Sequence, residues 1–269
     1  MTNSTYATGL ANTIRRTVLE QSKRAHVGHI GSSLSVADIL AGLYGGALRL
    51  DGPRSEQDRI VMSKGHAALA LYSALEATGR LEPGQIDTYC CDGTVLGVHP
   101  EAELDGVDFC TGSLGHGLSL GAGAALAGRL QKSLRRCVVV MSDAELNEGS
   151  VWEAVMVAAH HKLANLIAIL DLNGQQALGY TRDVIDLAPV ADRFRAFGWN
   201  VHEIDGHDPD LLISTIEQLD TVNGPPHMLV ADTTFGKGVS YMESKIAWHY
   251  MPMDDDQYAQ AIAEVGAPE

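Results

Sequence analysis

Two polar segments, each directly after a short apolar run, carry residue types that could hold a hard metal ion. Asp143 follows the run 137–141, and Asn173 follows the run 166–170. Short runs rich in β-branched residues and bounded by polar residues predict buried strands. In a parallel sheet the carboxyl ends of neighbouring strands line one crevice, so we expect Asp143 and Asn173 to lie close together. A carboxylate, an amide oxygen and a nearby backbone carbonyl suit Mg²⁺ or Ca²⁺, with phosphate oxygens completing the shell.

The same residues have a structural interpretation that is equally good. Aspartate commonly caps helices, and the pair formed by Asn173 and Gly174 is typical of turns. From this segment alone, metal-assisted diphosphate binding and a purely structural role both stay open.

Several histidines stand in polar or glycine-rich segments, where an imidazole could reach a ligand: His29, His66, His99 and His249. Imidazole exchanges protons near neutral pH, and it hydrogen-bonds phosphate or hydroxyl groups. The segment 26–35, around His29, is predicted to be a loop because of its glycines and serines. Ser63 and Lys64 stand where a strand passes into a helix, and such a turn suits phosphate. Each of these residues, taken singly, is also an ordinary turn or cap residue.

The elements that must position these residues alternate along the chain. Residues at helical spacing predict helices, and short β-branched runs predict strands between them. The predicted helices are 10–24, 36–48, 67–76, 117–132, 151–162, 183–197, 211–219 and 254–264. This alternation predicts an α/β fold, a doubly wound and mostly parallel sheet with helices on both faces. Because no repeat or shift in composition divides the chain, residues 1–269 are predicted to form a single domain.

The composition excludes several classes of protein. The chain has 269 residues and a net charge of −15, so no basic surface for nucleic acid is expected. No apolar run approaches the length of a membrane span, and the N-terminus has no signal-peptide pattern. The four cysteines lack zinc-site spacing and are predicted to be reduced thiols. We therefore expect a cytoplasmic protein with neither a membrane nor a nucleic acid as partner.

Several phrases of the sequence, in order, resemble those of one enzyme family. Ser-Lys-Gly-His-Ala at 63–67, Gly-Val-His-Pro at 97–100, Thr-Gly-Ser-Leu-Gly at 111–115 and Trp-His at 248–249 are similar to transketolase motifs. The segments 143–149 and 171–175 resemble the part of that family that holds the metal and the diphosphate. The resemblance covers roughly residues 6–264. It implies the thiamine diphosphate-binding fold, with thiamine diphosphate and Mg²⁺ as cofactors and Ca²⁺ or Mn²⁺ as substitutes for the metal.

The resemblance also implies a role for each candidate residue. The metal would be held by Asp143, Asn173 and Gln175. The catalytic histidines would be His29, His66, His99 and His249, of which His66 and His249 also contact the cofactor. The other cofactor contacts would come from Gly112, Ser113, Leu114, Asp143, Ala144, Glu145 and Asn173.

The chain departs from the family pattern at several positions. Ser142 and Ala144 replace both glycines of the family's Gly-Asp-Gly motif, which bears on the affinity for the cofactor. His116 replaces a glutamine, and Phe235 and Tyr250 also differ from the family's residues.

The match ends with the family's diphosphate-binding domain. In transketolases a second domain holds the aminopyrimidine and supplies the glutamate that activates the cofactor, and no segment here resembles it. We therefore expect the N-terminal subunit of a split transketolase, active only with a separate pyrimidine-binding C-terminal subunit in an α₂β₂ heterotetramer. Its reaction would be transfer of a two-carbon ketol unit from a ketose or ketose phosphate to an aldose acceptor, and the sequence leaves the sugars open.

Two alternatives remain at this point. The first is a subunit of another thiamine diphosphate enzyme, a 2-oxo acid dehydrogenase or a deoxyxylulose-phosphate-synthase-like protein; the Ser-Lys-Gly-His-Ala and Trp-His phrases favour transketolase over the former, and chain length argues against the latter. The second is a degenerate, non-catalytic binding subunit, because both glycines beside Asp143 are replaced. The retained histidines, Asp143 and Asn173 argue against the second alternative.

Overall fold

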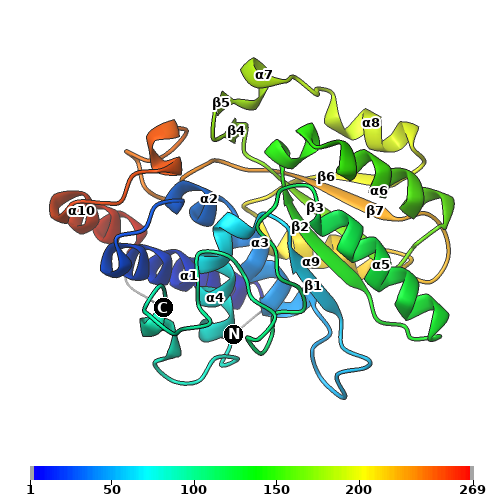
Figure 1. Ribbon diagram of the computed structural model, residues 1–269, viewed down its shortest axis with the longest axis horizontal. Helices are drawn as coiled ribbons and strands as arrows, with labels where there is room; N and C mark the ends of the chain where they lie inside the picture. The colour runs from blue at the N-terminus through cyan, green and yellow to red at the C-terminus, as the bar shows by residue number, and fades with distance from the viewer. Residues whose placement is uncertain (1–2, 267–269) are drawn as a thin grey trace.

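A parallel sheet forms the centre of the structure, a computed structural model that describes residues 3–266 (Figure 1). Its 5 strands, in spatial order, are β1 (Arg59–Met62), β2 (Cys137–Ser142), β3 (Leu166–Leu172), β7 (His227–Asp232) and β6 (Asn200–Asp205). Each neighbouring pair is parallel. A separate antiparallel hairpin joins β4 (Gln175–Gln176) to β5 (Gly179–Tyr180). The carboxyl ends of the five strands therefore meet at one edge of the sheet.

Helices cover both faces of this sheet. Figure 1 shows α1, α3 and α4 on one side and α5, α6 and α8 on the other. The first layer consists of α1 (Asn3–Ala25), α3 (Ala37–Gly42), α4 (Ala68–Ala77) and α9 (Pro209–Glu217), with α10 (Asp255–Val265) against α1. The second consists of α5 (Gly117–Leu130), α6 (Gly149–His160) and α8 (Val190–Ala196). Shorter elements are α2 (Ile30–Ser35), α7 (Thr181–Val184), a π turn at Leu43–Ala47, and 3₁₀ turns at Gly65–Ala67, Gln85–Thr88, Asp143–Asn147 and Ile246–His249.

Alternation along the buried strands separates two hydrophobic cores. In β2, Val138 and Val140 pack into the core under α1 and α4, whereas Val139 and Met141 pack into the core under α5 and α6. Side chains alternate across a strand, so a strand covered on both faces must be apolar throughout. The predicted α/β fold, with a doubly wound, mostly parallel sheet, is confirmed.

Two predicted elements differ from the structure. The helix predicted at 183–197 is interrupted, since α7 ends at Val184 and α8 begins at Val190. Pro189 favours a helix start at this point, because proline disfavours helical geometry in the residue before it. The segment 26–35, predicted to be a loop, contains the helix α2, whose residues are all buried. Its serines tolerate burial because they bond within the segment: Ser33 Oγ donates to the carbonyl of His29 (3.2 Å), and Ser35 Oγ to that of Ser32 (3.0 Å).

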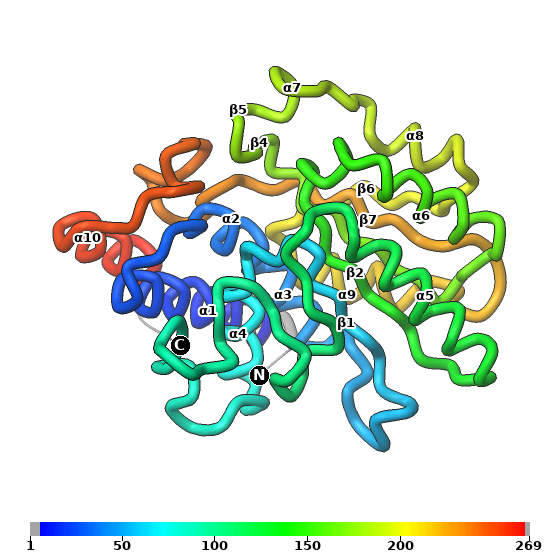
Figure 2. The backbone as a smooth tube through the Cα atoms, viewed as in Figure 1, coloured from blue at the N-terminus to red at the C-terminus, as the bar shows by residue number. Residues whose placement is uncertain are grey.

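The long segment between β7 and α10 completes the edge of the sheet. Figure 2 shows it running from the sheet toward α2. There the N–H of His29 donates to the carbonyl of His249 (3.3 Å), which joins the first part of the chain to the last. Within the described residues, no helix is both long and apolar enough to cross a membrane.

Candidate active site

Oxygen atoms of two neighbouring loops come together at the carboxyl edge of the sheet. Asp143 begins the turn after β2, and Asn173 follows β3, the strand paired with β2. The Asp143 carboxylate accepts hydrogen bonds from the N–H of Ala144 (2.9 Å) and of Gly174 (2.7 Å). The side-chain oxygen of Asn173 accepts from the N–H of Gln175 (3.0 Å). The structure thus brings the three predicted metal-binding residues into one place.

Asp143 is an acidic group in a crowded, buried position. It is 5% exposed, and burial together with the nearby Asp171 carboxylate raises the pKa of Asp143 to about 7. Donation from the backbone of Gly174 and Ala144 opposes this rise in part. The group is therefore surrounded by features that a cation would complement.

Asp171 and Lys64 form a buried ion pair that the sequence reasoning missed. Neither side chain is exposed, and Lys64 also donates to the carbonyl of Ser32 (3.1 Å). Burial opposes ionisation of Asp171, but the Lys64 ammonium holds the pKa of that carboxyl below its usual value. Lys64 therefore serves Asp171, which agrees with the structural interpretation of this turn rather than with phosphate binding. The sequence did contain a signal for this pair: Asp171 directly follows the apolar run 166–170. A charged side chain at the end of a buried strand needs a buried partner.

Three of the four predicted histidines form one cluster. The ring centroids of His29 and His66 are 5.5 Å apart, and that of His249 lies 6.0 Å from each. His29 precedes α2, His66 lies in the turn after β1, and His249 belongs to the segment before α10. The cluster thus joins three distant parts of the sequence.

Burial disfavours the charged form of every histidine in the cluster. Burial lowers the pKa of His29, His66 and His249, the last to about 4, and the Lys64 ammonium lowers those of His66 and His249 further. Ser32 Oγ lies 2.8 Å from Nε2 of His66. The Nδ1 atoms of His29 and His249 are buried and have no hydrogen-bond partner among residues 3–266. A neutral imidazole both donates and accepts hydrogen bonds, which suits phosphate and hydroxyl groups alike.

The fourth histidine lies beside the predicted cofactor-binding glycine. A Cβ atom at Gly112 would be 3.2 Å from Cδ2 of His99, so the absence of a side chain allows this contact. The backbone carbonyl of His99 accepts from the hydroxyl of Tyr72 (2.9 Å). In the same loop Ser113 is exposed and Leu114 is partly buried. His99 and the backbone of this loop therefore lie outside the cluster of His29, His66 and His249, in a different segment of the chain.

Glu145 links three loops beneath the site. It is fully buried, and its carboxylate accepts from Ser63 Oγ, from the N–H of Gly115 (3.0 Å) and from the N–H of Ser142 (2.9 Å). Ser142 has an extended backbone with φ −96°, so its conformation does not require glycine. Ala144 keeps the N–H that orients Asp143. The local structure therefore accommodates both replacements in the Gly-Asp-Gly motif.

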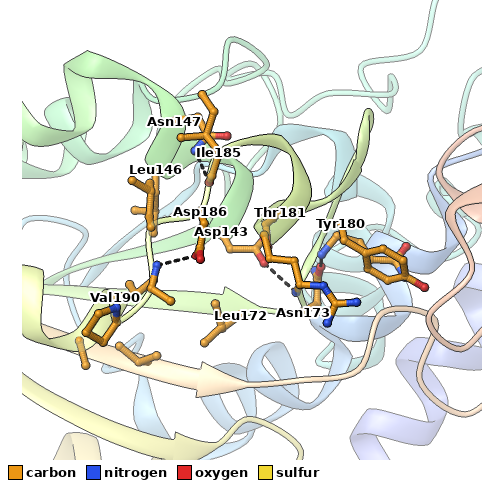
Figure 3. Close-up of a pocket in the computed structure, with 18 of the residues that line it drawn as sticks. Asp143, Leu146, Asn147, Leu172, Asn173, Tyr180, Thr181, Ile185, Asp186 and Val190 are labelled. Carbon is orange, nitrogen blue, oxygen red and sulfur yellow. Dashed lines mark hydrogen bonds between the residues drawn. The ribbon is translucent and has the colours of Figure 1, made fainter.

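A cavity of about 460 Å³ adjoins the side-chain oxygens of Asp143 and Asn173, here called the oxygen group. Figure 3 shows Asp143 and Asn173 in its wall, with Leu146 and Ile185 nearby. The segment containing α7 covers it, and Arg182 of that helix lies over the ring of Tyr180, 5.1 Å from its centroid.

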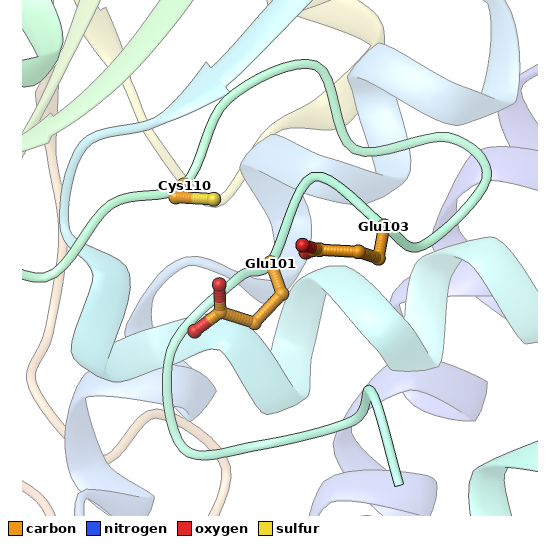
Figure 4. Close-up of side chains that lie close together, drawn as sticks. All are labelled: Glu101, Glu103 and Cys110. Atoms are coloured by element: carbon orange, nitrogen blue, oxygen red, sulfur yellow. The ribbon is translucent and has the colours of Figure 1, made fainter.

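A further set of potential metal ligands lies outside this site. The ligand atoms of Glu101, Glu103 and Cys110 are within 4.8 Å of one another on an exposed loop (Figure 4). All three residues are exposed, and solvated acidic groups commonly lie together without a metal. Sequence reasoning did not group these residues.

The fold and the site define a class of protein: a doubly wound α/β protein whose strand ends present oxygen ligands and neutral imidazoles, a combination suited to a phosphorylated ligand with a divalent cation. Comparison with known proteins narrows this class. Residues 6–268 match the family described as "Transketolase, thiamine diphosphate binding domain". The chain therefore belongs to the transketolase family and corresponds to its thiamine diphosphate-binding domain.

Similar proteins include single subunits of transketolases. The chain is 42% identical to an apulose-4-phosphate transketolase subunit of Phocaeicola vulgatus, over 93% of this chain and 90% of that protein. It is 40% identical to the 6-deoxy-6-sulfo-D-fructose transketolase subunit SqwG of a Clostridium species, over 95% and 94%. The crystal structure of transketolase from Campylobacter jejuni has a TM-score of 0.88 and 29% identity. That match covers 97% of this chain but only 43% of the Campylobacter chain.

Proposed function

We propose that this chain is the thiamine diphosphate-binding subunit of a two-component transketolase, completed by a separate pyrimidine-binding subunit. The reaction is transfer of a two-carbon ketol unit from a ketose, or ketose phosphate, to an aldose acceptor. The observation that carries this proposal is the position of the oxygen group and the histidine cluster at one edge of the sheet. Support comes from two relatives named as transketolase subunits, each similar over at least 90% of its length.

The site residues fit the cofactor in their chemistry. Asp143, Asn173 and Gln175, which lie on adjoining loops, would supply the oxygen ligands that Mg²⁺ prefers. Thiamine diphosphate, when bound, supplies the capacity to carry the two-carbon unit between sugars. His66 and His249 would hydrogen-bond the diphosphate of the bound cofactor.

The remaining residues orient the ligands or move protons. His29, in the cluster, and His99, in the loop beside Gly112, would hydrogen-bond the substrate hydroxyls and exchange protons with them, since both residues are only partly buried. The backbones of Gly112, Ser113 and Leu114 would support the cofactor's ring, and Ala144 would take part by donating its N–H to Asp143. For Glu145 we propose a structural role in place of the predicted cofactor contact: it holds the loops that carry these groups, because its carboxylate already accepts hydrogen bonds from Ser63, Gly115 and Ser142.

The proposed assembly is the one that the resemblance to transketolases implies. Residues 1–269 form one domain of the subunit, and two copies pair with two pyrimidine-binding subunits in an α₂β₂ heterotetramer. Sugar phosphates are the expected substrates. A cytoplasmic location agrees with the four free cysteines.

The first experiment is an assay of ketol transfer from xylulose 5-phosphate, with thiamine diphosphate and Mg²⁺. It compares this chain alone with the chain co-expressed with the product of the neighbouring reading frame. We expect activity only in the mixture, and Asp143→Ala should reduce it by at least about 100-fold because a metal ligand is lost. Asp186→Ala, at an exposed aspartate of the adjoining cavity, is the matched control and should retain activity.

Three results would contradict the proposal. Activity of the chain alone would rule out the need for a partner. Equal losses in the two aspartate variants would remove Asp143 from the metal site. Absence of thermal stabilisation of the complex by thiamine diphosphate and Mg²⁺ would indicate a degenerate, non-catalytic subunit.

A further inference from the structure

The ring of Phe235 lies flat against the imidazole of His249. The ring centroids are 5.0 Å apart and the planes differ by 2°. Phe235, which follows β7, is completely buried, and His249 is 6% exposed. Parallel rings at this separation are offset-stacked, an arrangement that aromatic pairs favour.

Packing, rather than hydrogen bonding, sets the plane of the His249 ring. Its Nδ1 atom is buried without a partner, and across residues 3–266 neither ring nitrogen takes part in a hydrogen bond. The backbone of His249 is held by the N–H of His29 (3.3 Å), but this bond leaves the side-chain torsions free. The face of Phe235 is therefore the main restraint on the orientation of the imidazole.

Phe235 is itself fixed from the other side by α2. A Cβ atom at Gly31 would lie 2.1 Å from Cε1 of Phe235, so the ring rests directly on the backbone of the helix. The N–H of Gly236 donates to the carbonyl of Gly31 (3.0 Å), and the carbonyl of Phe235 accepts from the N–H of Ser244 (2.9 Å). The aromatic ring has little space to move, so it can serve as a rigid support.

We propose that Phe235 is a positioning residue that fixes the orientation of His249 within the histidine cluster. Phe235 touches no ligand, because it is fully buried, and it acts only through the imidazole. The other groups that face His249 are the ring of the adjacent Tyr250 (centroids 5.9 Å apart), His29 from the segment before α2, and His66 and Lys64 from the turn after β1. The identity of the ligand that His249 meets, thiamine diphosphate, rests on the proposed function.

Two matched variants separate positioning from simple core stability. Phe235→Met keeps an apolar side chain of similar length but removes the flat ring. Phe194→Met is the control, because Phe194 is equally buried on the opposite face of the sheet and contacts no histidine ring within the described part of the chain. Its ring meets Trp199 edge-on (centroids 5.7 Å apart) and Trp152 at a tilt (5.6 Å). Thermal unfolding of both variants measures how much the melting temperature falls when the buried ring is lost at position 235 or at position 194.

The direct readout is nuclear magnetic resonance of the full chain with labelled histidines, with His249→Asn identifying the signals of His249. We expect Phe235→Met to shift and broaden these signals, because the imidazole then samples several orientations. Phe194→Met should leave them in place. Sharp, unshifted His249 signals in Phe235→Met would overturn the proposal, and this comparison needs no cofactor.

The second readout is the apparent Kd of the partner-completed complex for thiamine diphosphate in the presence of Mg²⁺. We expect Phe235→Met to weaken binding about tenfold, as loss of a supporting contact behind a ligand-binding residue does, with Phe194→Met close to the unaltered chain. Equal weakening in both variants would reduce Phe235 to an ordinary core residue. If the unaltered complex binds no thiamine diphosphate, the proposed function fails, whereas the resonance comparison still decides the role of Phe235.

Discussion

The buried ion pair of Lys64 and Asp171 contacts the proposed metal site, because Asp171 also bonds to Asn173. Asp171 accepts from Lys64, from Thr233 Oγ1, from Ser35 Oγ (2.7 Å) and from the amide nitrogen of Asn173 (3.1 Å). The last bond orients Asn173 so that its oxygen faces the loop that begins at Gly174. A buried, fully hydrogen-bonded charge thus determines which way a proposed metal ligand points.

Replacing Lys64 by Met should be strongly destabilising, because it leaves Asp171 buried without its counter-charge. We expect a loss of about 3–5 kcal/mol in the free energy of unfolding, measured by urea denaturation. Adding Asp171→Asn to the same chain should restore part of that loss. Lys23→Met is the control, since Lys23 pairs with Asp255, whose side chain is 97% exposed, and it should cost less than about 1 kcal/mol. Comparable losses at the two lysines would show that Asp171 does not depend on Lys64.

At the level of elements, α5 shows how small residues set the distance between a helix and the sheet. A Cβ atom at Gly121 would lie 2.3 Å from Cγ2 of Val139 in β2. Two residues further on, a Cβ atom at Gly123 would have no other atom within 4 Å. The same helix therefore has one glycine required by packing and one that only adds flexibility to the chain.

Alanine at these two glycines should have opposite effects on stability. Gly121→Ala forces α5 away from β2 and should cost about 1–3 kcal/mol. Gly123→Ala lowers the backbone entropy of the unfolded chain and should add up to about 1 kcal/mol. Urea denaturation of the two variants and the unaltered chain measures both effects. A stabilising Gly121→Ala would mean that α5 does not pack on the sheet as described.

At the level of the whole molecule, the histidine cluster depends on the complete fold. His29 and His249 stand near opposite ends of the sequence, and their rings are 6.0 Å apart only because the last segment returns to α2. The pKa of His249 is about 4 in the fold, against an ordinary value of 6.5. Between these values the unfolded chain binds a proton at this residue and the folded chain does not.

Folding stability should therefore fall as acid protonates His249 in the unfolded chain. The contribution of this residue is constant above pH 6.5 and becomes unfavourable as the pH falls from 6.5 toward 4. Relative to the unaltered chain, His249→Asn should gain about 2–3 kcal/mol in the free energy of unfolding between pH 7.5 and pH 4.5. Urea denaturation at a series of pH values measures this difference. The control is His160→Asn, because His160 is exposed. A difference that does not vary with pH would show that His249 is not buried as a neutral group.

Local patterns in the sequence predicted much of the fold. The strands at 137–141 and 166–170 follow from β-branched runs, and the helices around them follow from apolar spacing, because these signals arise between neighbours in the chain. The same logic placed Asp143 and Asn173 at adjoining strand ends. It failed at 183–197, where the effect of Pro189 was not weighed, and at α2, where serines bond to nearby carbonyls and so allow burial.

The sequence by itself determined the alternation of strands and helices, the family resemblance and the residue types available to the site. Only the tertiary structure decided that Lys64 pairs with Asp171, that Glu145 joins three loops, and that Phe235 lies flat on His249. The physical reason is distance along the chain. Periodicity and turn chemistry act over a few residues, whereas these contacts join segments that meet only after the sheet and both helix layers have packed.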